Sequence, residues 1–307
     1  YNNGDYGVYA FDAVDGVLDH SYASGSPDAG FYIGQCYPCD AIVNNVISEN
    51  NGLGYSGTNS GGSLYIISSV FKNNKGGLAP NTLDSELLPP ERETFIIGNL
   101  IENNNNIDAP ATQSTNLSLG NGVVIAGGNN NVIKNNVIAN HNLYGVIITA
   151  TADVNYWPAH GNRVESNLII NSKRADIASS GLSNLGNCFE NNYFNTSIPP
   201  GLQTLNKCDS SFYPLSADLS GMWSSLARVI QTSDENYNQG DWRTFEAPAN
   251  QPNMPIMDEL MSLGYDKTSL PVTKIWSSVK PAVEVFSQYE YVLEEIELPQ
   301  EARNYLN

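Results

Sequence analysis

One phrase recurs six times in the first two thirds of this chain. It consists of an apolar strand, a polar pair that usually contains Asn, two more apolar residues, and a polar run that ends in Asn. We place its marker position at Asn45, Ser69, Asn99, Asn136, Asn167 and Asn192. Self-similarity at periods of roughly 20 to 50 residues is typical of repeat architectures. A single repeat cannot bury its own apolar face, so several repeats must stack and share one core.

A second phrase, a Gly followed by a short apolar strand, precedes most of these markers. It begins at Gly7, Gly30, Gly77, Gly122 and Gly145. Each coil therefore holds two or three strands of three to five residues, separated by turns in which Asn and Gly tolerate positive φ. Successive strands would pair in parallel and stack like residues inward, while Asn side chains form ladders between coils. We predict an all-β, right-handed parallel β-helix of about seven coils. A leucine-rich repeat is excluded because no Leu-x-x-Leu-x-Leu pattern occurs.

The character of the chain changes after Cys208. The markers stop, and all four Met and three of the four Trp lie beyond this point. Residues 215–231 and 255–263 favour helices. We predict a β-helix over 1–208 and a mixed, partly helical extension over 209–307. The extension either caps the helix or, because exposed Trp and Met favour interfaces, binds a protein partner.

The four cysteines indicate an oxidising location. An even number in an acidic, Lys-poor chain fits an extracellular, cell-surface or periplasmic protein. Cys188 and Cys208 are predicted to staple the last coil to the segment after it. The pair Cys36 and Cys39 is compatible with a tight disulfide, a redox motif or half of a zinc site, and we favour the disulfide. No apolar run is long enough to span a membrane, no signal peptide is present, and the start at Tyr1 suggests a processed product or a missing beginning.

The charge of the chain restricts its partners. A net charge of −18 argues against binding nucleic acid, and an acidic polysaccharide would need a local basic patch or a bridging Ca²⁺. Carboxylates cluster in the first coil, at Asp12, Asp15 and Asp19. They are candidate Ca²⁺ ligands, although their spacing matches no EF-hand loop and equally suits a solvated acidic edge.

Long loops at 80–93, 107–119 and 150–161 interrupt the repeat. We expect them to project from one flank and wall a groove, because function usually lies on long loops of a rigid scaffold. The third loop and its surroundings offer sugar platforms, proton-transfer groups and cations. The candidates are Trp157 for binding, and Tyr156, His160, Arg163, Lys173 and Arg174 for catalysis, each of which also has a purely structural interpretation. His141 occupies an Asn-marker position, which favours a corner role.

The segments Gly4–Tyr9, Gly25–Gln35, Asn73–Gly77 and Gly122–Ile125 resemble bacterial right-handed parallel β-helix repeat proteins. The similarity is to the secreted parallel β-helix domain family within the pectin-lyase-like superfamily, and it covers about Gly4–Asn195. That superfamily includes pectate and alginate lyases and mannuronan epimerases. Asp19 with His20 is similar to the Asp and His of the epimerases, but their Asp-Pro-His-Asp motif is absent. The resemblance implies the fold and leaves the activity open.

Two functions are compatible with these features. The first is a non-catalytic structural or assembly component, or a subunit of a surface complex. The second is a polysaccharide lyase or epimerase acting on glycans that contain uronic acid. Clustering of His160, Arg163, Lys173 and Arg174 in one groove would favour the enzyme.

Overall fold

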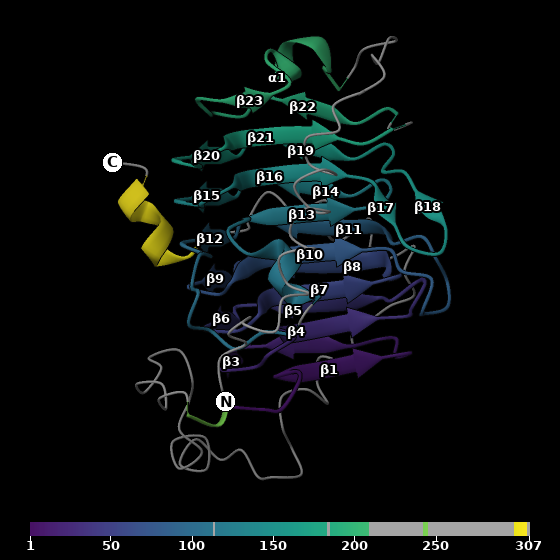
Figure 1. Cartoon of the computed structure of the whole chain (residues 1–307), viewed down its shortest axis with the longest axis vertical. Helices are drawn as coiled ribbons and strands as arrows, with labels where there is room; N and C mark the ends of the chain where they lie inside the picture. Colours follow the sequence, from purple (N-terminus) through teal and green to yellow (C-terminus); the bar gives the residue numbers. More distant parts are fainter. Residues whose placement is uncertain (113, 183–184, 209–241, 245–297, 306–307) are drawn as a thin grey trace.

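The computed structural model describes residues 1–112, 114–182, 185–208, 242–244 and 298–305, and its strands form three parallel sheets (Figure 1). Sheet A contains β1 (Val8–Phe11), β4 (Ala29–Gly34), β7 (Leu53–Thr58), β10 (Gly76–Asn81), β13 (Val123–Ala126), β16 (Tyr144–Thr149), β21 (Ala175–Ser180) and β23 (Ser197–Ile198). Sheet B contains β2 (Val17–Asp19), β5 (Ala41–Asn44), β8 (Gly61–Ile67), β11 (Arg92–Ile97), β14 (Val132–Lys134), β19 (Arg163–Glu165) and β22 (Cys188–Glu190). Sheet C contains β3 (Tyr22–Ser24), β6 (Ile47–Glu49), β9 (Val70–Lys72), β12 (Leu100–Glu102), β15 (Val137–Ala139) and β20 (Leu168–Ile170).

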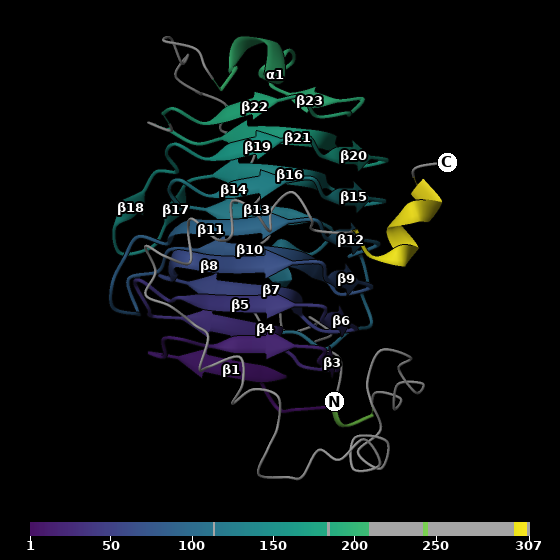
Figure 2. The same ribbon diagram turned by 180° about the vertical axis from the view of Figure 1, so that it is seen from behind.

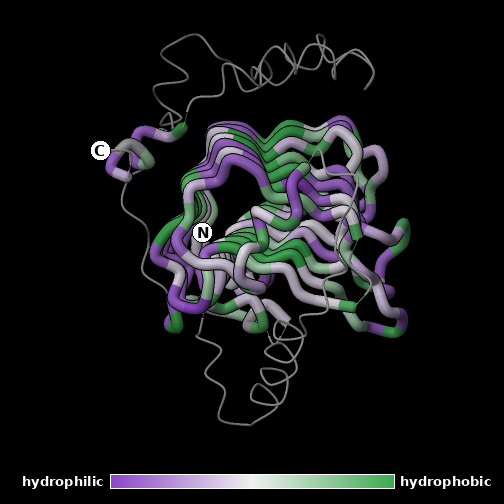
Figure 3. The backbone as a smooth tube through the Cα atoms, turned by 90° about the horizontal axis from the view of Figure 1, so that it is seen from above, coloured by the Kyte–Doolittle hydropathy of each residue, from purple (hydrophilic) through white to green (hydrophobic). Residues whose placement is uncertain are grey.

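The chain passes through sheets A, B and C in turn, so it is a right-handed parallel β-helix, as predicted. Seen along its axis, successive coils follow the same path (Figure 3). A short antiparallel pair, β17 (Thr151–Ala152) and β18 (Tyr156–Trp157), projects from the third long loop. The short helices are η1 (Thr115–Ser118), α1 (Leu202–Leu205), η2 (Trp242–Thr244) and η3 (Gln300–Tyr305).

The core consists of columns of like side chains, one from each coil. The pairing register of sheet A superposes Phe31, Tyr55, Leu78, Val123, Val146 and Ile177, all of them buried. Burial of apolar surface is the main stabilising term, at roughly 25 cal/mol per Å². Each coil supplies the surface that its neighbours need for burial.

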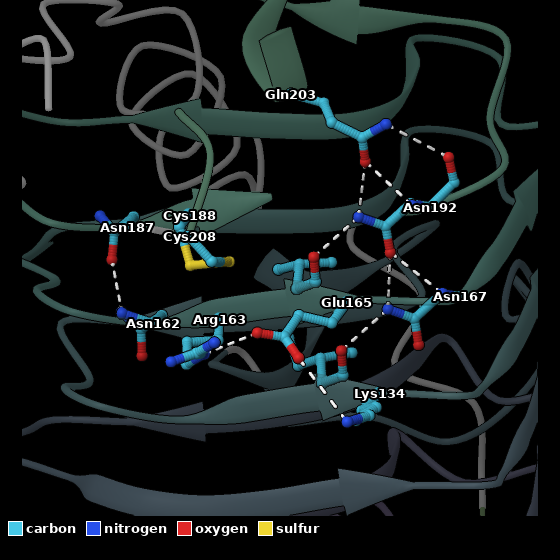
Figure 4. The surroundings of a disulfide bond; sticks show 12 residues. Lys134, Asn162, Arg163, Glu165, Asn167, Asn187, Cys188, Asn192, Gln203 and Cys208 are labelled. Carbon is cyan, nitrogen blue, oxygen red and sulfur yellow. Dashed lines mark hydrogen bonds and ion pairs between the residues drawn. A yellow bond between two sulfur atoms is a disulfide. The ribbon is translucent and has the colours of Figure 1, made fainter. Parts of the chain in front are cut away.

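Asparagine ladders run along the corners, as predicted. At the corner between sheets B and C, Asn99, Asn136, Asn167 and Asn192 are joined in series, each Nδ2 donating to the Oδ1 of the next. Gln203 of α1 ends the ladder by accepting from Asn192 at 2.9 Å (Figure 4). The first marker was wrong by one residue. Ile47 pairs with Val70, so Val46 and not Asn45 aligns with Ser69, while Asn45 takes the left-handed corner before it.

A second ladder at the corner between sheets C and A joins Asn51, Asn74 and Asn104. His141 takes the next position, and its Nε2 lies 3.2 Å from the Ile101 carbonyl oxygen. Burial lowers the pKa of His141 to about 4, so the ring is neutral. The expected corner role of His141 is confirmed. A third ladder, Asn131, Asn162 and Asn187, follows the corner between sheets A and B and was not predicted.

The Gly at the start of the first six strands of sheet A is required by close packing of coils, whereas β21 has Asp176 at the aligned position. A Cβ added at Gly7, Gly77 or Gly122 would lie 2.4, 2.1 or 2.5 Å from the main-chain oxygen of the corresponding Gly in the next coil. Any side chain there would push two coils apart.

All four cysteines are in disulfides, Cys36 with Cys39 and Cys188 with Cys208. Cys36 and Cys39 are 2% and 0% exposed, so a thiolate partner cannot reach them. The predicted disulfide between Cys36 and Cys39 is present and buried, and its purely structural role stays a prediction. The second disulfide fixes Cys208, which comes after α1, to β22 (Figure 4).

Residues 298–305 of the C-terminal extension pack on the flank of the helix, whereas Trp242 of η2 lies beside Gly4. Ala302 of η3 is buried against the outward side chains Val70, Leu100 and Val137 of sheet C (Figures 1 and 2). The Tyr305 hydroxyl donates to Glu102 and accepts from Asn140 Nδ2. The predicted helices at 215–231 and 255–263 lie outside the described residues, and the division at 208 stays a prediction.

One acidic side chain is buried within the wall and makes stability depend on pH. Glu91 is 0% exposed and accepts hydrogen bonds from Thr94 Oγ1 and Asn131 Nδ2, both at 2.8 Å. Burial raises the pKa of Glu91 from 4.5 to about 8. Between pH 4.5 and about 8 the folded state keeps a proton on Glu91 that the unfolded state has lost. The free energy of unfolding therefore falls as the pH rises through this range, by roughly 3 to 5 kcal/mol in all.

We expect Glu91→Gln, which imitates the protonated acid, to be more stable than the wild type at pH 8 and similar to it at pH 5. Urea denaturation at both pH values measures this. If the free energies of unfolding of Glu91→Gln and the wild type differ by the same amount at both pH values, Glu91 is not the titrating group.

Candidate functional site

Four aromatic rings gather on the outer face of sheet A in the first two coils, the purple end of Figure 1. Tyr6, Tyr9, Phe11 and Tyr32 make up this aromatic platform. In the strand Val8-Tyr9-Ala10-Phe11, alternation turns Val8 and Ala10 toward the core, and Tyr9 and Phe11 outward. The parallel register then places Tyr32 directly beside Tyr9.

The platform has a buried base and an exposed top. Tyr32 is 2% exposed and stacks on Tyr9, with ring centroids 4.8 Å apart. Tyr9 is 51% exposed and Phe11 39%, and their rings are nearly parallel, at 7° and 5.7 Å. Tyr6 packs against both tyrosines, at 4.6 and 4.8 Å. The result is a half-exposed cluster of aromatic rings held from below, against which the apolar face of a sugar ring can pack.

Three carboxyl groups adjoin the platform. Glu86 Oε1 accepts a hydrogen bond from the Tyr32 hydroxyl at 2.5 Å, and burial raises the pKa of Glu86. Burial, together with the charge of Asp5, raises the pKa of Asp28 to about 7, although Tyr6 donates a hydrogen bond to it. Asp5 itself is exposed. At neutral pH the site therefore combines aromatic rings with carboxyl groups, of which Asp28 is partly protonated.

Glu86 reaches the platform because hydrogen bonds hold the first long loop, residues 80–93, in place. The buried side chain of Asn59 donates to the Leu83 and Glu86 carbonyl oxygens at 2.7 and 2.8 Å and accepts from the Leu83 N–H at 3.1 Å. Gln35 Oε1 accepts from the Leu87 N–H at 2.8 Å. These bonds hold the main chain of Glu86 on both sides.

The three long loops do not share one flank, so that expectation was wrong. The loops at 80–93 and 150–161 lie between sheets A and B and meet where Asp84 accepts hydrogen bonds from Asn155, at 2.7 Å from N–H and 2.6 Å from Nδ2. The loop at 107–119 lies between sheets C and A, where Thr115 Oγ1 donates to the Pro27 carbonyl oxygen. The loops therefore stand at opposite edges of sheet A.

The predicted site residues of the third loop form hydrogen bonds with neighbouring loops. The Tyr156 hydroxyl donates to the Leu182 carbonyl oxygen at 2.6 Å, and Trp157 Nε1 donates to Asp84 Oδ1 at 3.2 Å. His160 Nδ1 accepts from the Leu185 N–H at 3.0 Å. Tyr156 is still 39% exposed, and a sugar-binding role for Tyr156 and Trp157 stays a prediction.

The predicted cations do not gather beside these residues. Arg163 forms a 2.6 Å ion pair with Glu165 (Figure 4). Lys173 and Arg174 precede β21, at the edge of sheet A opposite the third loop. A strand of this length places them about 15 to 20 Å away. The structure therefore does not bring His160, Lys173 and Arg174 into one groove, and their catalytic roles stay predictions.

The predicted calcium ligands do not converge either. Asp19 is occupied by Asn44 Nδ2 at 3.0 Å and by His20 Nδ1 at 2.9 Å. Asp12 and Asp15 both take positive φ in the connection between β1 and β2, and both are exposed. Over the described ranges, the grouping of metal-ligand type is Glu165 with Cys188 and Cys208, whose sulfurs are already bonded to each other. The geometry gives calcium binding at Asp12, Asp15 and Asp19 no support.

The aromatic platform was not predicted, although its signal was present in the sequence. The outward positions of the first strand are Tyr9 and Phe11, and the next coil repeats an aromatic at Tyr32. A strand facing water on one side seldom needs aromatic residues on that side. These residues had been interpreted only as part of the repeat.

Comparisons with known proteins give the chain no family name. No family model and no curated protein matches it. Among solved structures, the A-module of the Azotobacter vinelandii mannuronan C-5 epimerase AlgE4 is similar at 13% identity, with a TM-score of 0.32. The match covers 59% of this chain and 56% of that module, so this chain spans little more than half of its length. Within the described residues, no helix has the length and apolarity needed to cross a membrane.

Proposed function

We propose that this chain is a non-catalytic glycan-binding β-helix protein of the cell surface, periplasm or extracellular space, and that the aromatic platform is its binding site. The observation that carries the proposal is the half-exposed ring of Tyr9 stacked on buried Tyr32. Such a surface binds a sugar ring with little loss of side-chain entropy, because the ring of Tyr9 is already held. The two disulfides support the location.

The alternative, a lyase or epimerase of uronic acids, has less support at this site. That chemistry needs a cation to neutralise the substrate carboxylate before the adjacent proton can leave. The charged groups acting on the platform tyrosines and on Asp28 are instead the carboxylates of Asp5, Asp28 and Glu86. A partner-binding role for the extension 209–307 stays a separate prediction.

We expect Tyr9→Ala to weaken glycan binding by roughly tenfold, because an exposed aromatic contact contributes about 1 to 1.5 kcal/mol. Affinity electrophoresis against a panel of soluble polysaccharides, followed by calorimetry on the best ligand, measures this. Tyr193→Ala is the matched control, since Tyr193 is 67% exposed at the opposite end of the helix.

Equal affinity of the wild type and Tyr9→Ala would contradict the proposal. Release of unsaturated or epimerised products from uronic-acid polymers by the wild type would contradict its non-catalytic part.

A further inference from the structure

The platform has a one-sided electrostatic environment. Burial and the charges of Glu86, Asp5 and Asp28 all raise the pKa of Tyr9. The same three carboxyl groups raise the pKa of Tyr6. Two of these groups touch the platform directly, because Glu86 accepts from the Tyr32 hydroxyl at 2.5 Å and Asp28 accepts from Tyr6. Their charges can therefore act on a ligand stacked on the exposed ring.

The described groups that act on the platform rings are acidic, and the guanidinium of Arg243 packs over the ring of Trp242, which lies beside Gly4. The ionisable groups that shift the pKa values of Tyr6, Tyr9, Tyr32 and Asp28 are all carboxyl groups or tyrosines. A uronic acid stacked on Tyr9 would bring a fourth negative charge. A ligand carrying positive charge would be attracted both by the carboxylates and by the faces of the tyrosine rings.

We propose that the platform selects glycans that carry protonated amino groups, such as a partly or fully de-N-acetylated polymer of glucosamine. This inference rests on the proposed function and names the ligand class of the same site. The sugar ring would stack on Tyr9, and its ammonium group would be bound by Asp5 and Asp28. These two residues are already linked at the base of the platform, where the Asp28 N–H donates to the Asp5 carbonyl oxygen at 2.9 Å.

Binding of an ammonium group beside Asp28 would also displace a proton. The pKa of Asp28 is raised by burial and by Asp5 to about 7, so near neutral pH the acid is about half protonated. A cation beside it favours the ionised form and lowers this pKa. At a pH where the amino groups of the ligand are fully protonated, binding of an amino glycan is therefore expected to release protons, whereas binding of an acetylated glycan is not.

The test is calorimetry with three 1,4-linked hexamers of matched length, made of β-glucosamine, β-N-acetylglucosamine and α-galacturonic acid. We expect the glucosamine hexamer to bind at least tenfold more tightly than the acetylated one at low salt, and the galacturonic acid hexamer to bind least. Added salt should weaken binding of the glucosamine hexamer alone. Repeating the titration in buffers of different ionisation enthalpy detects the released proton.

Asp5→Asn should reduce the preference for the glucosamine hexamer by about threefold to tenfold, since Asp5 is exposed and its charge acts on the platform. Asp28→Asn should reduce it further, and circular dichroism checks that its fold is kept. Glu301→Gln is the control, because Glu301 is exposed on η3, which packs on the flank of sheet C away from the platform. Suppose the acetylated and free hexamers bind with equal affinity, and Tyr9→Ala weakens binding of both. That result would overturn the preference for amino glycans but would leave the proposed glycan-binding function standing. Absence of any Tyr9-dependent binding would overturn both.

Discussion

Replacement of Asn136 by Ala is expected to lower the free energy of unfolding by about 4 kcal/mol or more. Asn136 Oδ1 accepts from the N–H and the Nδ2 of Asn99, at 2.9 and 3.0 Å. Its Nδ2 donates to the Ile96 carbonyl oxygen and to Asn167 Oδ1, both at 2.9 Å. The side chain therefore joins three consecutive coils. Alanine would deprive the buried Asn99 N–H of this acceptor and would remove one bond each from Asn99 Nδ2, the Ile96 carbonyl oxygen and Asn167 Oδ1. Each buried group left without a partner costs about 1 to 3 kcal/mol.

Urea denaturation followed by circular dichroism measures this effect. Asn142→Ala is the matched control, because Asn142 is exposed and lies outside the ladders, and a change within about 0.5 kcal/mol is expected. A loss below 1 kcal/mol in Asn136→Ala would show that the ladder contributes little to cohesion between coils.

Replacement of Gly77 by Ala is expected to lower the free energy of unfolding by nearly as much as replacement of Asn136. The Cβ of Gly77→Ala would lie 2.1 Å from the Gly122 main-chain oxygen and 3.0 Å from Ile101 Cγ2. The obstacle is backbone, which is itself fixed by pairing to the next coil, so no rotamer change can relieve the contact. Overpacking of this kind costs typically 1 to 3 kcal/mol, and we expect about 3 kcal/mol or more here because two coils must separate.

The midpoint of thermal unfolding measures this change, and Gly16→Ala is its control. A Cβ at Gly16 meets nothing within 4 Å, so that variant should unfold at the wild-type temperature. If Gly77→Ala unfolds at the wild-type temperature, neighbouring coils lie further apart at this position than the structure shows.

The sequence predicted the fold well because a stacked coil is specified by local chemistry. Positive φ at the corners requires residues such as Asn135 or Asn191, and close apposition of coils requires Gly at Gly77 and Gly122. These requirements recur in every coil, so they were readable as a period. The one misplaced marker, Asn45, arose because corner and ladder positions are adjacent and both accept Asn.

The site was predicted poorly because its parts come from positions that the repeat does not relate. The sequence favoured the third loop on the strength of Tyr156, Trp157 and His160, which in the structure bind the neighbouring loops. The pairing of Tyr32 with Glu86 joins residues 54 positions apart, through a loop of irregular length. The repeat pattern does not predict which residues of the β-helix such a loop will contact.

The sequence by itself thus determined the solenoid, its buried columns, its Asn corners and its Gly-led strands, since each coil repeats the same few backbone and packing constraints. Only the tertiary structure decided which outward residues meet. Register set Tyr9 beside Tyr32, the pinned loop brought Glu86 to them, and the same stacking carried Lys173 and Arg174 to the far edge of sheet A. The outer face of a coil is under no repeating constraint, and its arrangement is decided by contacts between distant segments.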